Sequence, residues 1–390
     1  MSLRPLTTLR HFITALTLLI AVLFGVEIWL RSTQAPAALI VAGQAPIEDQ
    51  SLLVPSAVYH HELRRLQQTS HVTEPGAKPI EIRINSLGCR GGEIESAPQA
   101  GVRRILLLGD DTICGTQVSE SETVAAWLRK FFTQSTGEDV EIINAGVPGY
   151  CPLLASLKFQ HDLSKLKPDV VVLHIDMTDI ADDCCYRSLT LQEGDHSVCS
   201  HPTLRLHAKP ENPTLQLVRQ SATASWLFAK TRQHGPELLS VSRASLSEHQ
   251  GLMWITDNPP DLRLQIDHAL KPIKSLQDSV KQSGGQLLVT TSPILWQVVS
   301  ADQAPELSRR LGITGKTPFA STFPFELLRS LCQEADIPFC DASLAFRRDK
   351  AEKLFSKSAP VLSKVGMALY AREITRSLVE LTSTPRTPAE

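Results

Sequence analysis

Several features that would place this chain in a common functional class are missing from its sequence. There is no basic stripe: 39 Lys and Arg are scattered among 41 Asp and Glu, and the net charge is −2. A nucleic-acid partner, which needs clustered positive charge, is therefore not expected. The eight cysteines contain no Cys-x-x-Cys pair, so their spacing does not indicate a zinc site. Glycine is less frequent than proline, 20 against 25, which favours long ordered loops over flexible linkers.

Long apolar runs are scarce too, and only residues 12–30 form one of membrane-spanning length. These 19 residues contain a single charge, Glu27, and about 20 residues are needed to cross a bilayer. Arg4 and Arg10 precede the run, which predicts a cytoplasmic amino terminus. We expect residues 1–31 to be a cytoplasmic tip and single-pass transmembrane helix, with the bulk of the chain exoplasmic or periplasmic. A cleaved signal peptide is the alternative.

The expected compartment affects how the cysteines are interpreted. In an oxidising compartment, disulfides form and persist. The order of the sequence suggests three pairings: Cys114 with Cys151, Cys184 or Cys185 with Cys199, and Cys332 with Cys340. Buried free thiols are an equally good interpretation, and the spacing leaves the choice open.

Strands and helices are expected to alternate through most of the 390 residues. Continuous apolar runs predict buried strands, and amphipathic stretches predict helices. The expected strands are 103–108, 140–144, 170–175, 286–291 and 337–340, and the expected helices are 123–134, one ending near 166, 261–282, 325–335 and 364–381. This alternation predicts right-handed βαβ units. The expected fold class is α/β, a flavodoxin-like three-layer sandwich with a central parallel sheet in the strand order 2-1-3-4-5.

Outside this alternation, the chain divides by composition. Residues 32–84 are polar and contain proline, and we interpret them as a stem and lead-in that ends in a strand at 80–84. The main domain is expected over 85–381. Residues 181–260 break its pattern and are interpreted as an insertion over the carboxyl edge of the sheet. Residues 382–390 are expected to be a disordered tail.

A polar turn, Gly109-Asp110-Asp111, follows the first expected strand. Ligands of open α/β sheets bind at the carboxyl ends of strands, so this turn is a candidate site. A strand followed by Gly-Asp-x-x-x-x-Gly resembles the first block of the SGNH, or GDSL-type, hydrolases. The later blocks of that family are matched in order by residues 144–150, 176–179 and 358–366, and the resemblance spans about 85–381. It implies hydrolysis or acyl transfer on carbohydrate or lipid esters, and places Gly146 and Thr178 at oxyanion-hole positions.

Three signature side chains of the family are replaced in this sequence. Asp111 stands at the position of the nucleophilic serine, Thr178 at that of the asparagine and Val361 at that of the histidine. Acyl transfer of this kind needs a nucleophile with an adjacent base, and valine cannot accept a proton. We therefore favour a pseudoenzyme with a binding or scaffolding role at the cell envelope. The alternative is an active esterase that uses a rearranged acidic site with Asp111 as its nucleophile.

Several carboxylates are expected to meet where the triad would lie. Asp110 follows the first strand, and Asp176 and Asp179 follow the third, which is its neighbour in the expected order. Crowded like charges raise each other's pKa unless something compensates them. A divalent cation such as Ca²⁺ or Mg²⁺, a basic side chain or a cationic ligand would do so. The alternative is that these carboxylates cap turns and helices. No other cofactor is expected, and the identity of any metal is left open.

His174 and Arg90 lie near these carboxylates in the sequence. His174 lies two residues before Asp176, so strand alternation allows both to face the same side. A histidine on a buried strand is more often packed under a helix, and we expect that role for His174. Arg90 lies in an Asn-x-x-Gly-x-Arg-Gly segment just before the first block, and we expect it to hold that loop in place. The expected partners of the protein are a membrane and a carbohydrate or acyl-ester ligand.

Overall fold

The computed structural model describes residues 52–72, 78–187, 189–193, 196–202, 204, 263–311, 321–348, 353–357 and 359–383. The expected transmembrane segment, most of the expected insertion and the expected tail lie outside these residues. None of the helices in the described part of the chain combines the length and apolar character needed to span a bilayer. All the described residues belong to one compact unit.

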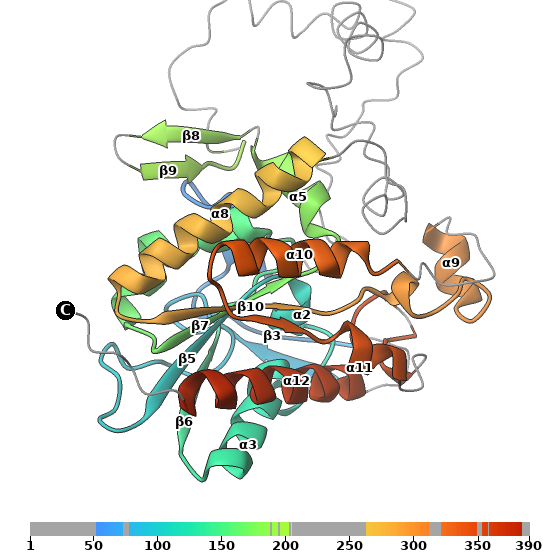
Figure 1. The fold of residues 1–390 in the computed structure, drawn as a ribbon, viewed down its shortest axis with the longest axis horizontal. Coiled ribbons are helices and arrows are strands. Elements are labelled where there is room, and N and C mark those ends of the chain that lie inside the picture. The colour runs from blue at the N-terminus through green and yellow to red at the C-terminus, as the bar shows by residue number, and fades with distance from the viewer. Residues whose placement is uncertain are drawn as a thin grey trace, which may run out of the picture. The chain divides into compact units, whose positions relative to one another are not determined.

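A sheet of five parallel strands forms the centre of this unit (Figure 1). Its members are β5 (Arg103–Leu108), β6 (Val140–Asn144), β7 (Val170–Ile175), β10 (Gln286–Thr291) and β11 (Phe339–Asp341). Their spatial order is β11-β10-β7-β5-β6. The strand numbers of the whole chain include hairpins outside this sheet; counted within the sheet, the order is 2-1-3-4-5. The carboxyl ends of β5 and β7 are therefore adjacent.

Helices cover both faces of the sheet, as expected for an α/β sandwich. Figure 1 shows α3 (Val124–Thr136) and α12 (Lys364–Ser383) together on one side of the sheet. On the other side lie α8 (Arg263–Gln282) and α10 (Phe323–Glu334), with α4 (Pro152–Lys158) packed against α8. Because helices cover both faces, the strands are rich in apolar residues, and all of β7 is buried.

Local sequence signals explain where these helices begin and end. The Thr123 side chain accepts a hydrogen bond from the Ala126 N–H and caps α3, which ends at Gly137 with φ +73°. The helix expected to end near 166 is shorter and less regular. Regular α-structure stops at Lys158, and the chain continues to Leu166 as a π-turn and a 3₁₀-turn.

Part of the expected stem packs onto the domain. Residues 53–83 contain two antiparallel hairpins, β1 (Leu53–Pro55) with β2 (His61–Leu63) and β3 (Gln68–His71) with β4 (Ile80–Arg83). Buried side chains from this segment, including Tyr59 and Leu63, belong to the same hydrophobic core as the sheet. A segment expected to be irregular up to residue 80 is therefore folded from residue 52 onward.

The remaining described elements are short. They are α2 (Asp111–Cys114), η2 (Glu120–Glu122), α5 (Asp179–Arg187), the hairpin β8 (Thr190–Glu193) and β9 (His196–Cys199), η7 (Leu295–Gln297), α9 (Pro305–Leu311) and α11 (Ser343–Arg348). Of the expected insertion, the structure describes the end of α5, this hairpin and a few residues after it.

Of the two interpretations that the sequence leaves open for the cysteines, the structure supports buried free thiols. Cys151, Cys332 and Cys340 are buried thiols without a disulfide. The Cys199 thiol donates to the carbonyl oxygen of Tyr186 at 3.4 Å, which is a bond that a disulfide sulfur cannot make. Burial raises the pKa of Cys332 to about 12 and that of Cys340 to about 11. These two thiols therefore behave as small apolar side chains of the core.

Candidate functional site

The turn after β5 is shaped by a glycine and an N-cap. Gly109 has φ +152°, and a Cβ there would lie 2.9 Å from the His174 Cβ, so a larger residue does not fit. Asp110 is the N-cap of α2, and its Oδ1 accepts a hydrogen bond from the Thr112 N–H at 3.0 Å. This bond directs the Asp110 carboxyl to the carboxyl edge of the sheet.

Asp110 and Asp176 meet there, as the sequence predicts, but they do so around His174. The His174 Nε2 atom lies 3.7 Å from Asp110 Oδ1 and 3.9 Å from Asp176 Oδ2. All three residues are buried, with 6%, 2% and 7% exposure for Asp110, His174 and Asp176. The expectation that His174 only packs under a helix is thus incomplete, because its ring also lies between two carboxyl groups. We call these three residues the acid–imidazole cluster.

The other ring nitrogen of His174 is held by a buried hydroxyl chain. His174 Nδ1 and Tyr370 Oη are 2.6 Å apart, and Tyr370 Oη lies 2.6 Å from Thr290 Oγ1. Thr290 in turn donates to the Leu173 carbonyl oxygen at 3.4 Å. Because the Thr290 hydroxyl proton is used in that bond, Thr290 Oγ1 accepts a hydrogen bond from the Tyr370 hydroxyl. Tyr370 Oη in turn accepts a hydrogen bond from His174 Nδ1, which therefore carries a proton. Among the described residues Nε2 has no hydrogen-bond partner, although it faces two carboxyl groups.

The pKa values of Asp110, Asp176 and Asp179 are shifted in different directions. Burial, together with the charge of Asp176, raises the pKa of Asp110 well above its usual range. Burial and the charges of Asp176 and Asp110 do the same for the pKa of Asp179. Burial also opposes ionisation of Asp176, but interactions with His174 and Thr178 outweigh it and hold the pKa of Asp176 below its usual value. Asp176 is therefore the carboxylate that stays ionised.

The two expected oxyanion-hole positions are bonded within the protein. The Thr178 N–H and hydroxyl both donate to Asp176 Oδ1 at 2.7 Å. The Gly146 N–H donates to Asn144 Oδ1 at 3.2 Å. A Cβ at Gly146 would lie 2.4 Å from the Cys114 nitrogen, so this glycine permits close packing against α2. In this structure the Gly146 and Thr178 donors bond to the Asn144 and Asp176 side chains.

Asp111, at the expected nucleophile position, is the first residue of α2 and is partly exposed. Its charge contributes to the raised pKa values of both Asp110 and Asp182. Burial is the main cause for Asp182 and raises its pKa to about 8. Asp111 therefore lies at the rim of an acidic region in which at least one carboxyl group is mostly protonated at neutral pH.

Val361 lies in the loop before α12, where the family resemblance expects a histidine. This loop is close to the turn after α2, since the Gln117 Nε2 donates to the Leu362 carbonyl oxygen at 3.0 Å. The loop is shaped by a bond from the Ser356 N–H to the Val361 carbonyl oxygen at 2.8 Å. The position is thus on the same side of the sheet as Asp111, but it carries an apolar side chain.

The expected structural role of Arg90 is confirmed. Its guanidinium donates to the carbonyl oxygens of Cys114, Gly115 and Val118, with 2.8 Å to Cys114 and 2.7 Å to Val118. These bonds satisfy the backbone at the end of α2. Arg90 therefore does not neutralise the acid–imidazole cluster.

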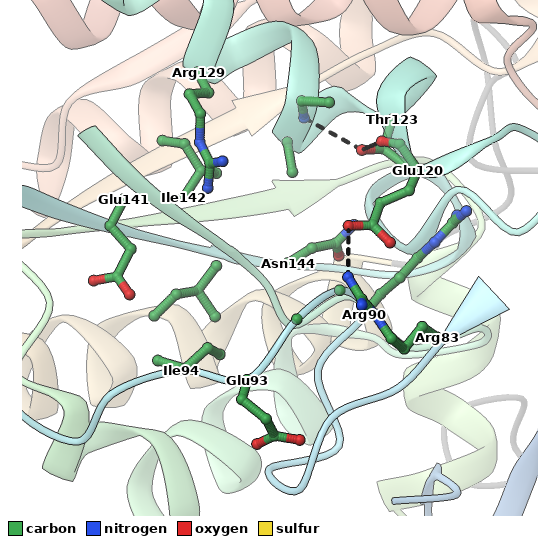
Figure 2. A pocket seen from close by; sticks show the side chains of 15 residues that line it. Arg83, Arg90, Glu93, Ile94, Glu120, Thr123, Arg129, Glu141, Ile142 and Asn144 are labelled. Atoms are coloured by element: carbon green, nitrogen blue, oxygen red, sulfur yellow. Dashed lines mark hydrogen bonds and ion pairs between the residues drawn. The ribbon is translucent and has the colours of Figure 1, made fainter. Parts of the chain in front are cut away.

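A hollow of about 330 Å³ lies elsewhere, along the edge strand β6 and beside α3. Figure 2 shows arginine and glutamate side chains around it, including Arg83, Arg129, Glu120 and Glu141. Arg83 and Glu120 form an exposed ion pair at 3.5 Å, and the charges of the lining are mixed. No member of the acid–imidazole cluster is among the described residues that line it. We therefore take it as a charged surface hollow separate from the candidate site.

Comparison with known proteins gives likeness only at the level of solved structures. No protein-family model matches the sequence, and no curated protein matches it. One similar structure is a variant of an acetyl xylan esterase from Geobacillus stearothermophilus, with 12% identity, a TM-score of 0.39, and coverage of 73% of this chain and 97% of that chain. Another is the lipase/acylhydrolase from Enterococcus faecalis, with 13% identity, a TM-score of 0.37, and coverage of 73% and 100%. At such identities and scores, these likenesses establish neither a family nor an activity.

Proposed function

We propose that this chain is a membrane-anchored, SGNH-hydrolase-like pseudoenzyme with a binding or scaffolding role at the cell envelope. The observation that carries the proposal is the pair of replacements at the cleft. The first residue of α2 is Asp111, and the loop beside that helix presents Val361. Serine-type acyl transfer requires a nucleophile and a base that act as one unit, and neither is supplied here.

His174 does not take over the role of the missing base. Its side chain is fully buried, its Nδ1 is bonded to Tyr370, and its Nε2 faces Asp110 and Asp176. A general base must reach the proton that it removes, and this ring is enclosed by protein groups. The acid–imidazole cluster instead offers carboxyl groups, which suit a cation or a ligand with hydroxyl donors. The family resemblance suggests a carbohydrate or an acyl ester as such a ligand.

The proposed location rests on residues 12–30, which lie outside the described residues. Their length and low charge suit a single-pass anchor, and Arg4 and Arg10 favour a cytoplasmic amino terminus. Alkaline extraction of membranes from expressing cells tests this placement. An anchored chain stays in the membrane pellet at full length, whereas a cleaved signal peptide gives a shortened, extractable product.

The catalytic side of the proposal is tested with the full-length protein in detergent. Hydrolysis of short acyl esters, such as p-nitrophenyl acetate, is measured beside the Asp111→Ala variant. We expect equal rates, both at the level of the buffer and detergent background. Turnover that disappears in the variant would make Asp111 a catalytic residue and would overturn the proposal.

One observation favours an active enzyme as the second candidate. Asp182 has a pKa of about 8, so it is mostly protonated at neutral pH, and it interacts with the carboxyl group of Asp111. Such pairs serve as general acid and base in other hydrolases. This candidate predicts ester turnover that falls as pH rises through 8 and is lost in Asp182→Asn. A flat, background-level pH profile would exclude it.

A further inference from the structure

We propose that the acid–imidazole cluster is a zinc site, with Asp110 Oδ1, His174 Nε2 and Asp176 Oδ2 as its three protein ligands. The inference rests on the proposed binding function, because it names a ligand for the same cleft. The three residues come from the turn after β5 and from the end of β7, two neighbouring strands whose carboxyl ends meet.

The spacing of the three donor atoms suits a small metal ion. They all lie within 4.8 Å of one another, and Nε2 is 3.7 Å and 3.9 Å from the two oxygens. Zinc binds nitrogen and oxygen at about 2.0–2.2 Å, so two ligands of a tetrahedral ion are about 3.4 Å apart. Shifts of a few tenths of an ångström would bring Nε2 to this spacing from each oxygen, and side-chain rotation would bring the two oxygens, which lie within 4.8 Å of each other, closer together.

The orientation of His174 is an independent observation that points to a cation. The hydroxyl chain through Tyr370 and Thr290 places the proton on Nδ1. The Nε2 lone pair is then directed at two carboxyl groups, and no described residue donates to it. A lone pair that faces an ionised carboxylate in a buried place is unfavourable unless a carboxyl proton or a positive charge lies between them. A metal ion at that point would satisfy all three groups.

The ligand types select the metal. Ca²⁺ and Mg²⁺ prefer oxygen ligands alone, whereas an imidazole beside carboxylates suits zinc and other divalent transition metals. We therefore propose zinc in place of the Ca²⁺ or Mg²⁺ that the sequence suggests. Zinc takes four ligands in a tetrahedral site, and Asp110, His174 and Asp176 would supply three of them.

Each of the three ligands is already oriented by a second contact. Asp110 accepts from the Thr112 N–H, His174 is bonded to Tyr370, and Asp176 accepts two hydrogen bonds from Thr178. Outer contacts of this kind fix the rotamer and the tautomer of metal ligands. All three side chains of the cluster are thus held in place by a second contact, as is expected of metal ligands.

The competing explanation places a second proton on His174 instead of a metal. An imidazolium would also neutralise the facing carboxyl groups. It requires no metal, and it predicts that zinc neither binds to nor stabilises the protein. The two explanations differ in one measurable quantity, the zinc content of the folded chain.

The experiment uses full-length protein in detergent, stripped with a chelator and then dialysed against ZnCl₂. We expect about one zinc ion per chain by mass spectrometry of the metal, and a visible absorption band when Co²⁺ replaces zinc. Asp110→Asn and His174→Gln are expected to weaken zinc binding at least about tenfold. Asn is as good an N-cap as Asp, so Asp110→Asn preserves the start of α2. His161→Gln, a histidine outside the cluster, is the matched control and should retain zinc.

Each outcome decides the inference. Parent protein without stoichiometric zinc, or zinc retained in a folded Asp110→Asn variant, would overturn the site. Circular dichroism and thermal melting show which variants are folded. The ester assay, repeated with and without zinc, separates this inference from the proposed function. Zinc binding with turnover would keep the site and overturn the pseudoenzyme, while no zinc and no turnover would do the reverse.

Discussion

Charged side chains are buried at both ends of strand β5, but only those at the amino end have all their hydrogen bonds satisfied within the protein. At the amino end, the Arg104 side chain is fully buried. Its five N–H groups all donate: one to Glu141 at 2.6 Å and the others to backbone carbonyl oxygens, which belong to Glu95, Ser96, Ala97 and Leu166. At the carboxyl end, Asp110 faces His174 and Asp176 at distances beyond hydrogen bonding.

This difference separates a structural charge from a site. Every N–H donor of the Arg104 side chain has an acceptor within the protein, so the guanidinium holds the loop at 95–97 in place and needs no ligand to satisfy it. The acid–imidazole cluster keeps a ring nitrogen without a partner among the described residues, beside two carboxyl groups of which Asp110 has a raised pKa. Buried polar groups left in this state are where an ion or ligand gains most.

Removing the satisfied charge should have the largest effect. Arg104→Ala leaves Glu141 and several buried carbonyl oxygens without their donor, and we expect a loss of about 3–5 kcal/mol in the free energy of unfolding. Arg103→Ala is the matched control. Arg103 makes only a 3.6 Å surface pair with Glu138, so it should cost about 0–1 kcal/mol. Urea denaturation measures both, and equal losses would contradict the comparison.

A methyl group at Gly146 should disturb the carboxyl end by crowding it. The new Cβ would meet the Cys114 nitrogen at 2.4 Å, where the backbone of α2 has little freedom to move. We expect Gly146→Ala to lower the free energy of unfolding by about 1–3 kcal/mol. Gly92→Ala is the control, since its Cβ would lie 3.6 Å from the flexible end of Arg83. Similar stability of the two variants would show that α2 can shift.

Tyr370→Phe tests the support of His174. It deprives both the His174 Nδ1 and the Thr290 hydroxyl of a buried partner, at a cost of about 1–3 kcal/mol. Tyr150→Phe removes a comparable buried bond, to the His61 carbonyl oxygen at 2.7 Å. Both variants should lose stability, but only Tyr370→Phe should weaken zinc binding, by about tenfold or more. Equal zinc affinity in the two variants would separate Tyr370 from the site.

The last effect expected is a pH dependence at the rim of the cluster. The pKa of Asp182 is about 8 in the folded protein and about 3.9 in an unfolded chain. The folded state therefore holds this proton more tightly, so the stability that it contributes is lost as pH rises from about 4 through 8. Relative to the parent, Asp182→Asn should gain more than about 1 kcal/mol between pH 5 and pH 9. Parallel stability curves over that range would refute the raised pKa.

The sequence alone determined the framework of this protein. The bounds of β5, β6, β7 and β10 agree with the apolar runs that predict them, because strands covered on both faces are largely apolar. The same framework brings Asp110 and Asp176 to one edge, since parallel neighbours end together. The role of Arg90 also followed from its place in a glycine-rich loop.

Only the tertiary structure decided what surrounds these carboxyl groups. Tyr370 is 196 residues from His174, and Thr290 is its neighbour across β7 and β10. No local pattern marks either residue, so the hydroxyl chain that sets the tautomer of His174 could not be predicted from the sequence. The choice between disulfides and free thiols, which the spacing of the cysteines leaves open, was decided in the same way. Periodicity records which face of an element is buried, whereas strand register and helix placement decide which buried side chains meet.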